Sequence, residues 1–102
     1  MTLPEFLDAL TASAAIFAWY DDDIGQLRAW TAGTEHDALT AVAYYQLGAT
    51  YCPYLQWDRA ASALGLSLDD ASAIVSAEDR DSRHDPALAR ALRAAVGLPE
   101  NV

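Results

Sequence analysis

The chain has 102 residues, 53% of them hydrophobic, and a net charge of −9 from 15 acidic and six basic side chains. This length accommodates a single domain, 1–102, and its apolar content excludes a disordered acidic tail. The acidity disfavours nucleic acid and anionic membranes as direct partners, because both are polyanions, and it favours a cationic partner.

The acidic excess is concentrated in the first part of the chain. All six cations are arginines, and residues 1–56 hold seven acids against Arg28 alone. The single cysteine, Cys52, cannot form an internal disulfide, and the N-terminal segment lacks the basic region of a signal peptide. We therefore expect a cytoplasmic protein.

The first predicted helix covers 3–20, where Thr2 and Glu5 form a capping box at its start. Three aspartates at 21–23 end it and cap a short second helix over 23–31. A rival interpretation makes 15–31 a β-hairpin that turns at these aspartates. Apolar spacing of three and four residues on both sides of the aspartates favours the helices.

The next predicted helix covers 35–48, between Gly33 and Gly48, with a second capping box formed by Thr34 and Asp37. It is apolar nearly all round. A helix without a polar face is buried or lies at an interface, so a homodimer through this helix is one possibility. An uncharged run extends from it, but it relies on alanine and tyrosine and contains proline, so we expect a core helix and a turn, not a membrane span.

Three further helices are predicted from caps and stop signals, over 54–64, 68–78 and 86–96. Gly65 ends the first of them, and a third capping box, formed by Ser67 and Asp70, opens the second. The repeated caps and stops predict an all-α protein, a compact bundle of five to six short helices. The bundle contains a helix-turn-helix-like pair.

The pair lies in 57–76, where small and apolar residues flank a glycine in the turn: Ala61, Leu64, Gly65, Leu66, Ala71 and Ile74. This stretch resembles the helix-turn-helix superfamily. In that family the exposed positions of the second helix read the major groove, and the matching positions here are Leu68, Asp69, Asp70, Ser72 and Ala73. None of these side chains pairs well with purines. We therefore expect two packed helices with a structural role only. The alternative is a transcription-associated helix-turn-helix regulator that dimerises through the helix over 35–48.

Two sets of residues are candidates for partner binding. Eight of the ten aromatic side chains are tryptophan or tyrosine, the types that dominate interface hot spots, and all eight lie between Trp19 and Trp57. The candidates for contact are Trp19, Tyr20, Trp30, Tyr44 and Tyr45. The candidates for an acidic patch are Asp21, Asp22, Asp23, Glu35 and Asp37.

Two His-Asp pairs, at His36 and at His84, suggest a further hypothesis, a small metal-dependent hydrolase. Both pairs lie at predicted helix starts, where the aspartate serves as a cap. There is no P-loop, no glycine-rich nucleotide fingerprint and no G-x-S-x-G. We therefore expect no catalytic residue, no metal, no cofactor and no enzymatic activity.

In size, charge and lack of catalytic motifs the chain resembles the small acidic inhibitors of phages, which include anti-CRISPR and DNA-mimic proteins. That resemblance implies a non-enzymatic module that binds a larger, nucleic-acid-handling protein. Such a module occupies the partner's basic surface in place of nucleic acid and modulates or inhibits the partner.

Overall fold

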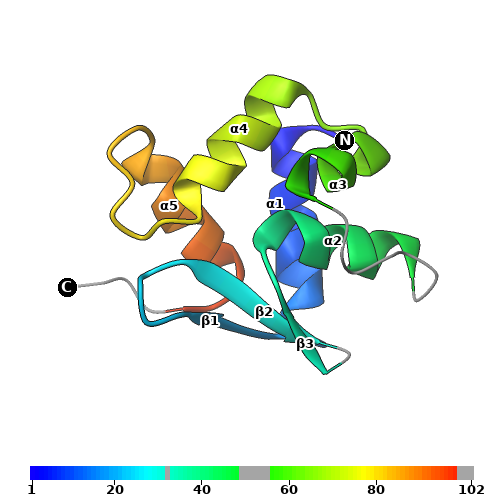
Figure 1. The fold of residues 1–102 in the computed structure, drawn as a ribbon, viewed down its shortest axis with the longest axis horizontal. Coiled ribbons are helices and arrows are strands. Elements are labelled where there is room, and N and C mark those ends of the chain that lie inside the picture. Colours follow the sequence, from blue (N-terminus) through cyan, green and yellow to red (C-terminus); the bar gives the residue numbers. More distant parts are fainter. Residues whose placement is uncertain (32, 49–55, 99–102) are drawn as a thin grey trace.

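A computed structural model describes residues 1–31, 33–48 and 56–98 (Figure 1). The elements in chain order are α1 (Leu3–Ser13), β1 (Ala18–Asp21), β2 (Leu27–Thr31), β3 (Thr34–His36), α2 (Ala38–Leu47), α3 (Trp57–Leu64), α4 (Leu68–Ala77) and α5 (Pro86–Ala95). The predicted turn around Cys52 lies outside the described residues.

The prediction of an all-α bundle is wrong. The described residues form five helices and a three-stranded antiparallel sheet in the order β1-β2-β3, a mixed α/β fold. The predicted helix over 3–20 ends at Ser13, and the predicted helix over 23–31 does not exist. The rival interpretation, a hairpin that turns at the aspartates, describes this region.

Alternation explains why a hairpin forms here. Leu27 and Ala29 are buried, whereas Arg28 and Trp30, between and after them, face the other way. A segment this short holds too few apolar residues for their spacing to tell a helix from a strand. The turn decides between them, because Asp22 accepts the backbone N–H groups of Ile24 and Gln26 at 3.0 and 2.9 Å.

The turn also needs a residue with positive φ, and Gly25 supplies it with φ 81°. Its amide donates to the carbonyl of Asp22 at 3.0 Å, and its carbonyl accepts the amide of Arg80 at 2.8 Å. The hairpin turn is therefore tied to the segment that follows α4.

The predicted helix over 35–48 begins later, at Ala38, because Thr34–His36 pair with β2 as β3. The predicted capping box at Thr34 is thus wrong, and Asp37 is the cap: its carboxylate accepts the amide of Thr40 at 2.7 Å. The first six residues of α2 are buried by α1, α3, α4 and the sheet. Burial inside one chain explains the lack of a polar face.

The helix pair in 57–76 is present. Gly65, at φ 73° and ψ 22°, follows α3 in the left-handed conformation, and Ser67 caps α4 by accepting the amide of Asp70. Asp85 caps α5 in the same way, with Pro86 in its first turn. The capping box at Thr2 and Glu5 also holds. At Ser67 and Asp70 the structure shows the Ser67 cap without the reciprocal contact of a box, and the aspartates at 21–23 cap no helix because that segment forms the hairpin.

The helices all lie on one side of the sheet, and the core fills the space between them (Figure 1). Its largest fully buried side chains come from four of the helices and from β2: Phe6, Leu10, Leu27, Leu39, Val42, Ile74 and Leu92. Within the described parts of the chain, no helix combines the length and apolarity that crossing a membrane requires.

One buried cation joins the sheet to the helices. The guanidinium of Arg93, on α5, donates to the carbonyls of Ala77 and Glu78 at 2.6 Å each, and to that of Gly25 at 3.3 Å. It also pairs with the carboxylate of Asp21 at 2.9 Å. A single side chain thus contacts the end of α4, the hairpin turn and the end of β1.

Replacing Arg93 with methionine keeps much of the side-chain volume but leaves these carbonyls and the Asp21 carboxylate without their donor. We expect the free energy of unfolding in urea to fall by about 3–5 kcal/mol, the usual cost of breaking a buried ion pair. Arg90→Met, at an exposed position of the same helix, is the control and should change stability by at most about 0.5 kcal/mol. Equal losses in the two variants would contradict the structural role of Arg93.

Candidate partner-binding surface

The sheet has one face that none of the described helices packs against (Figure 1). Adjacent side chains along a strand point to opposite faces, and the register places Ala18, Tyr20, Arg28, Trp30 and Glu35 together on the uncovered side. We call these five residues the outer sheet face. Their neighbours along the strands point the other way and are buried: Trp19, Leu27, Ala29 and His36.

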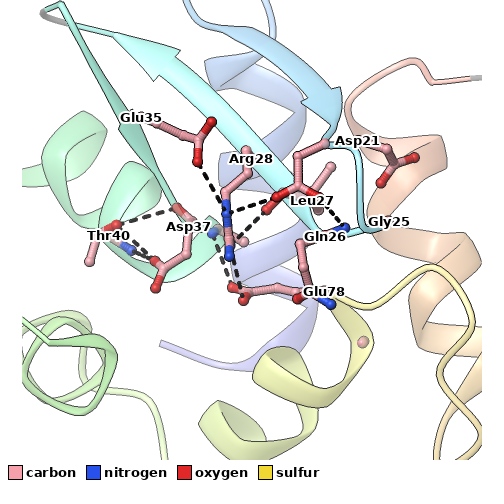
Figure 2. A network of polar contacts seen from close by, with 12 residues as sticks. Asp21, Gly25, Gln26, Leu27, Arg28, Glu35, Asp37, Thr40 and Glu78 are labelled. Carbon is pink, nitrogen blue, oxygen red and sulfur yellow. Dashed lines mark hydrogen bonds and ion pairs between the residues drawn. The ribbon is translucent and has the colours of Figure 1, made fainter.

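Arg28 lies among carboxylates on this face (Figure 2). Its Nε is 3.7 Å from Oδ2 of Asp22 and 3.6 Å from Oε1 of Glu35, and its Nη1 is 3.8 Å from Oε2 of Glu78. One positive charge thus faces three carboxyl groups from three parts of the chain. The side chain of Glu35 is 47% exposed, so this group remains open to solvent.

Two pKa shifts follow from this arrangement. The Tyr20 hydroxyl donates to Oε2 of Glu35, and this hydrogen bond, with lesser effects of burial and nearby carboxylates, raises the pKa of Tyr20 to about 12. The amide of Gln26 is the main cause that holds the pKa of the Asp22 carboxyl below its ordinary value. Asp22 is therefore ionised, and Tyr20 is a neutral hydrogen-bond donor, at any physiological pH.

An open hollow of about 380 Å³ lies beside the outer sheet face, where the hairpin turns. Its lining is acidic except for one aromatic and one aliphatic side chain: Tyr20, Asp21, Asp22, Asp23, Ile24 and Glu35. Ile24 is 78% exposed at the rim, and Trp30, which lies opposite Glu35 on β2, is 52% exposed. Large apolar side chains and carboxylates thus share one surface.

The structure brings five of the ten predicted binding residues to this surface, and these are Tyr20, Asp22, Asp23, Trp30 and Glu35. Two others are engaged elsewhere. Trp19 is buried, and its indole N–H donates to the Ser13 hydroxyl at 3.1 Å. Asp21 lines the hollow, but one carboxylate oxygen is taken by Arg93.

The remaining three predicted residues belong to α2. Asp37 caps that helix through Thr40. Tyr44 and Tyr45 are half-buried and pack on Phe17, with ring centroids 6.1 and 6.0 Å from it. A role for any of the ten in partner binding stays a prediction, but the structure shows which of them form one surface.

Sequence reasoning missed Glu78, which follows α4 and is almost fully buried. Its Oε1 accepts the amide of Ala38, at the N-terminus of α2, at 3.0 Å. Burial is the main cause that raises the pKa of Glu78 to about 8, and the nearby charge of Asp37 adds to it. The signal was available, because Glu78 continues the buried stripe of Ala71 and Ile74 at helical spacing.

The two histidines lie in different surroundings. His36 is 3% exposed, its ring lies 5.9 Å from that of Tyr44, and neither ring nitrogen has a hydrogen-bond partner among the described residues. Burial lowers the pKa of His36. His84 is exposed in the loop before α5. Within residues 1–31, 33–48 and 56–98, no group of three or more potential ligand side chains could hold a metal ion.

Comparisons with protein-family models, curated proteins and solved structures give no match to this chain.

The raised pKa of Glu78 predicts how stability depends on pH. Because this pKa of about 8 lies above the ordinary value of 4.5, the folded protein binds a proton that the unfolded chain releases between these two values. The contribution of Glu78 is therefore fully favourable at low pH and is lost as the pH rises through about 8. Glu78→Gln keeps the oxygen that accepts the Ala38 amide but cannot ionise.

We expect the wild-type protein to lose a few kcal/mol of stability relative to Glu78→Gln between pH 5 and pH 9. Urea unfolding of both proteins across this range measures the difference. His36 also titrates on unfolding, but it is present in both proteins and largely cancels. A difference that does not change with pH would show that Glu78 is ionised in the folded protein at all these values.

Proposed function

We propose that this chain is a non-enzymatic acidic protein-binding module, of the kind phages use as inhibitors, that occupies a basic, nucleic-acid-binding surface of a larger protein. The observation that carries the proposal is the outer sheet face, left uncovered by the helices, with half-exposed Trp30 and the carboxylates of Asp22, Asp23 and Glu35. The proposal includes a cytoplasmic location, where such partners act.

The mixed character of this surface supports a protein partner. An antiparallel sheet often turns one face to solvent, but that face is then mostly polar. Here an exposed tryptophan and an exposed isoleucine lie beside the carboxylates. Exposed aromatic side chains gain most from burial against another protein, whereas carboxylates direct a cationic partner to the same place.

Charge gives the module its mode of action. Carboxylates in the hairpin and on β3 present several negative charges to a surface that otherwise binds phosphates. Attraction of this kind speeds association and weakens with added salt. Only Arg28 opposes it among the side chains of the outer sheet face.

The alternative function is a helix-turn-helix regulator that dimerises through α2. The geometry of α3, Gly65 and α4 favours it. Its second helix, however, exposes Leu68 and Asp69, which offer nothing to phosphates or purines, and most of α2 is buried within the chain. A mobility shift of genomic DNA fragments that persists at physiological salt would favour this alternative.

A pull-down from lysate tests the main proposal. The chain has no lysine, so amine coupling of this 102-residue protein proceeds through Met1. The N-terminus lies at the end of the molecule opposite the sheet, so coupling there leaves the outer sheet face accessible (Figure 1). The test variant combines Asp22→Asn, Asp23→Asn and Glu35→Gln, and it spares Asp21 because that residue holds Arg93.

The control variant combines Asp8→Asn, Asp69→Asn and Asp81→Asn, which removes the same charge from exposed positions elsewhere. We expect the wild type and the control to retain a basic, nucleic-acid-handling protein after nuclease treatment and to release it with salt. The test variant should retain it at least about tenfold less, a loss that corresponds to a few weak ion pairs. Equal retention by all three proteins, or recovery of DNA alone, would refute the proposal.

A further inference from the structure

The outer sheet face is small, and its size limits what can cover it. Three strands at ordinary spacing span roughly 10 Å, and the five residues of β2 extend roughly 17 Å. A globular interface of ordinary size needs about 800 Å² on each partner, several times this area. An extended segment of about five residues matches the dimensions of the face. The ligand that fits the outer sheet face is therefore a short stretch of a partner chain.

The neighbours of Trp30 leave one side of its ring free. Across the sheet, Trp30 lies between Ala18 on β1 and Glu35 on β3. A methyl group cannot cover an indole, and Trp30 stays 52% exposed. A flat cation placed over this ring would also lie next to the carboxylate of Glu35. Arginine matches this pair better than lysine does, because its guanidinium is planar and stacks on aromatic faces.

The hollow beside the hairpin turn offers the same combination a second time. Tyr20 forms its aromatic wall, and Asp22, Asp23 and Glu35 provide carboxylate oxygens. Arg28 shows that a guanidinium is accommodated among these groups, since its Nε lies 3.7 and 3.6 Å from two of them. Its single charge leaves the carboxylates in excess, so the face still attracts a cation.

We propose that the outer sheet face docks an extended, arginine-rich segment of the partner protein, with one arginine stacked on Trp30 against Glu35 and a second in the hollow beside Tyr20. This inference rests on the proposed function and names the chemistry of the partner that it requires. Arginine side chains at alternate positions of an extended segment lie about 7 Å apart, a spacing suited to neighbouring sites on one sheet face.

Two capped seven-residue peptides test the inference, one with arginine at every second position and glycine between, the other with lysine in place of arginine. Their charges are equal, so any difference reflects stacking and the geometry of the guanidinium. Binding is followed by nuclear magnetic resonance at low salt, through the indole N–H of Trp30 and the amides of β1 to β3. We expect shifts confined to these signals and at least about fivefold tighter binding of the arginine peptide.

Matched variants locate the site. Glu35→Gln and Trp30→Thr should each weaken the arginine peptide about fivefold or more, whereas Asp69→Asn, which removes the same charge as Glu35→Gln from an exposed position on α4, should change binding less than about twofold. Equal binding of the two peptides, equal effects of Glu35→Gln and Asp69→Asn, or no shifts on the sheet would overturn the inference. The pull-down would still decide the proposed function, because a basic partner held by the carboxylates of Asp22, Asp23 and Glu35 without an arginine-rich segment would be retained by the wild type and the control and lost from the test variant.

Discussion

The guanidinium of Arg93 is the contact on which the arrangement of sheet and helices depends. It satisfies the last carbonyls of α4 and binds the hairpin through Gly25 and Asp21. Helix ends leave carbonyls without partners, and buried ones must be satisfied. A small sheet depends on packing its apolar face against other elements. Arg93, together with the backbone hydrogen bonds from Leu27 to Glu78 and from Arg80 to Gly25, fixes the position of the outer sheet face relative to α4 and α5.

Glu78 and Arg28 extend the same connection to the surface. The backbone carbonyl of Glu78 accepts hydrogen bonds from the guanidinium of Arg93 and from the amide of Leu27. Its side chain accepts the amide of the first residue of α2 and lies beside Arg28. Arg28 in turn lies beside Asp22 and Glu35 on the outer sheet face. A proton gained or lost by the buried carboxyl therefore changes how strongly Arg28 is drawn inward.

Much of the helical part of the fold is predictable from the sequence, and the sheet is not. The caps at Thr2, Ser67 and Asp85 are local signals, since a side chain bonds an amide three residues away. The strands depend on pairing between segments, and over five residues the apolar pattern of β2 does not distinguish a strand from a helix. Thr34 and Asp37 have the spacing of a capping box, yet pairing with β2 takes Thr34 into β3.

The candidate surface shows the same division. Composition makes acids and aromatics candidates for partner binding, but it cannot tell a side chain that supports the fold from one that faces solvent, such as Trp19 from Tyr20. The pleat makes that distinction, because it sends Trp19 inward to Ser13 and Tyr20 outward to Glu35. Conversely, Arg28 is the only arginine or lysine in residues 1–56, and it lies beside the carboxylates of Asp22 and Glu35. Arg28 reduces repulsion among the carboxylates without cancelling their charge, and so lets the folded chain keep an acidic surface beside its sheet.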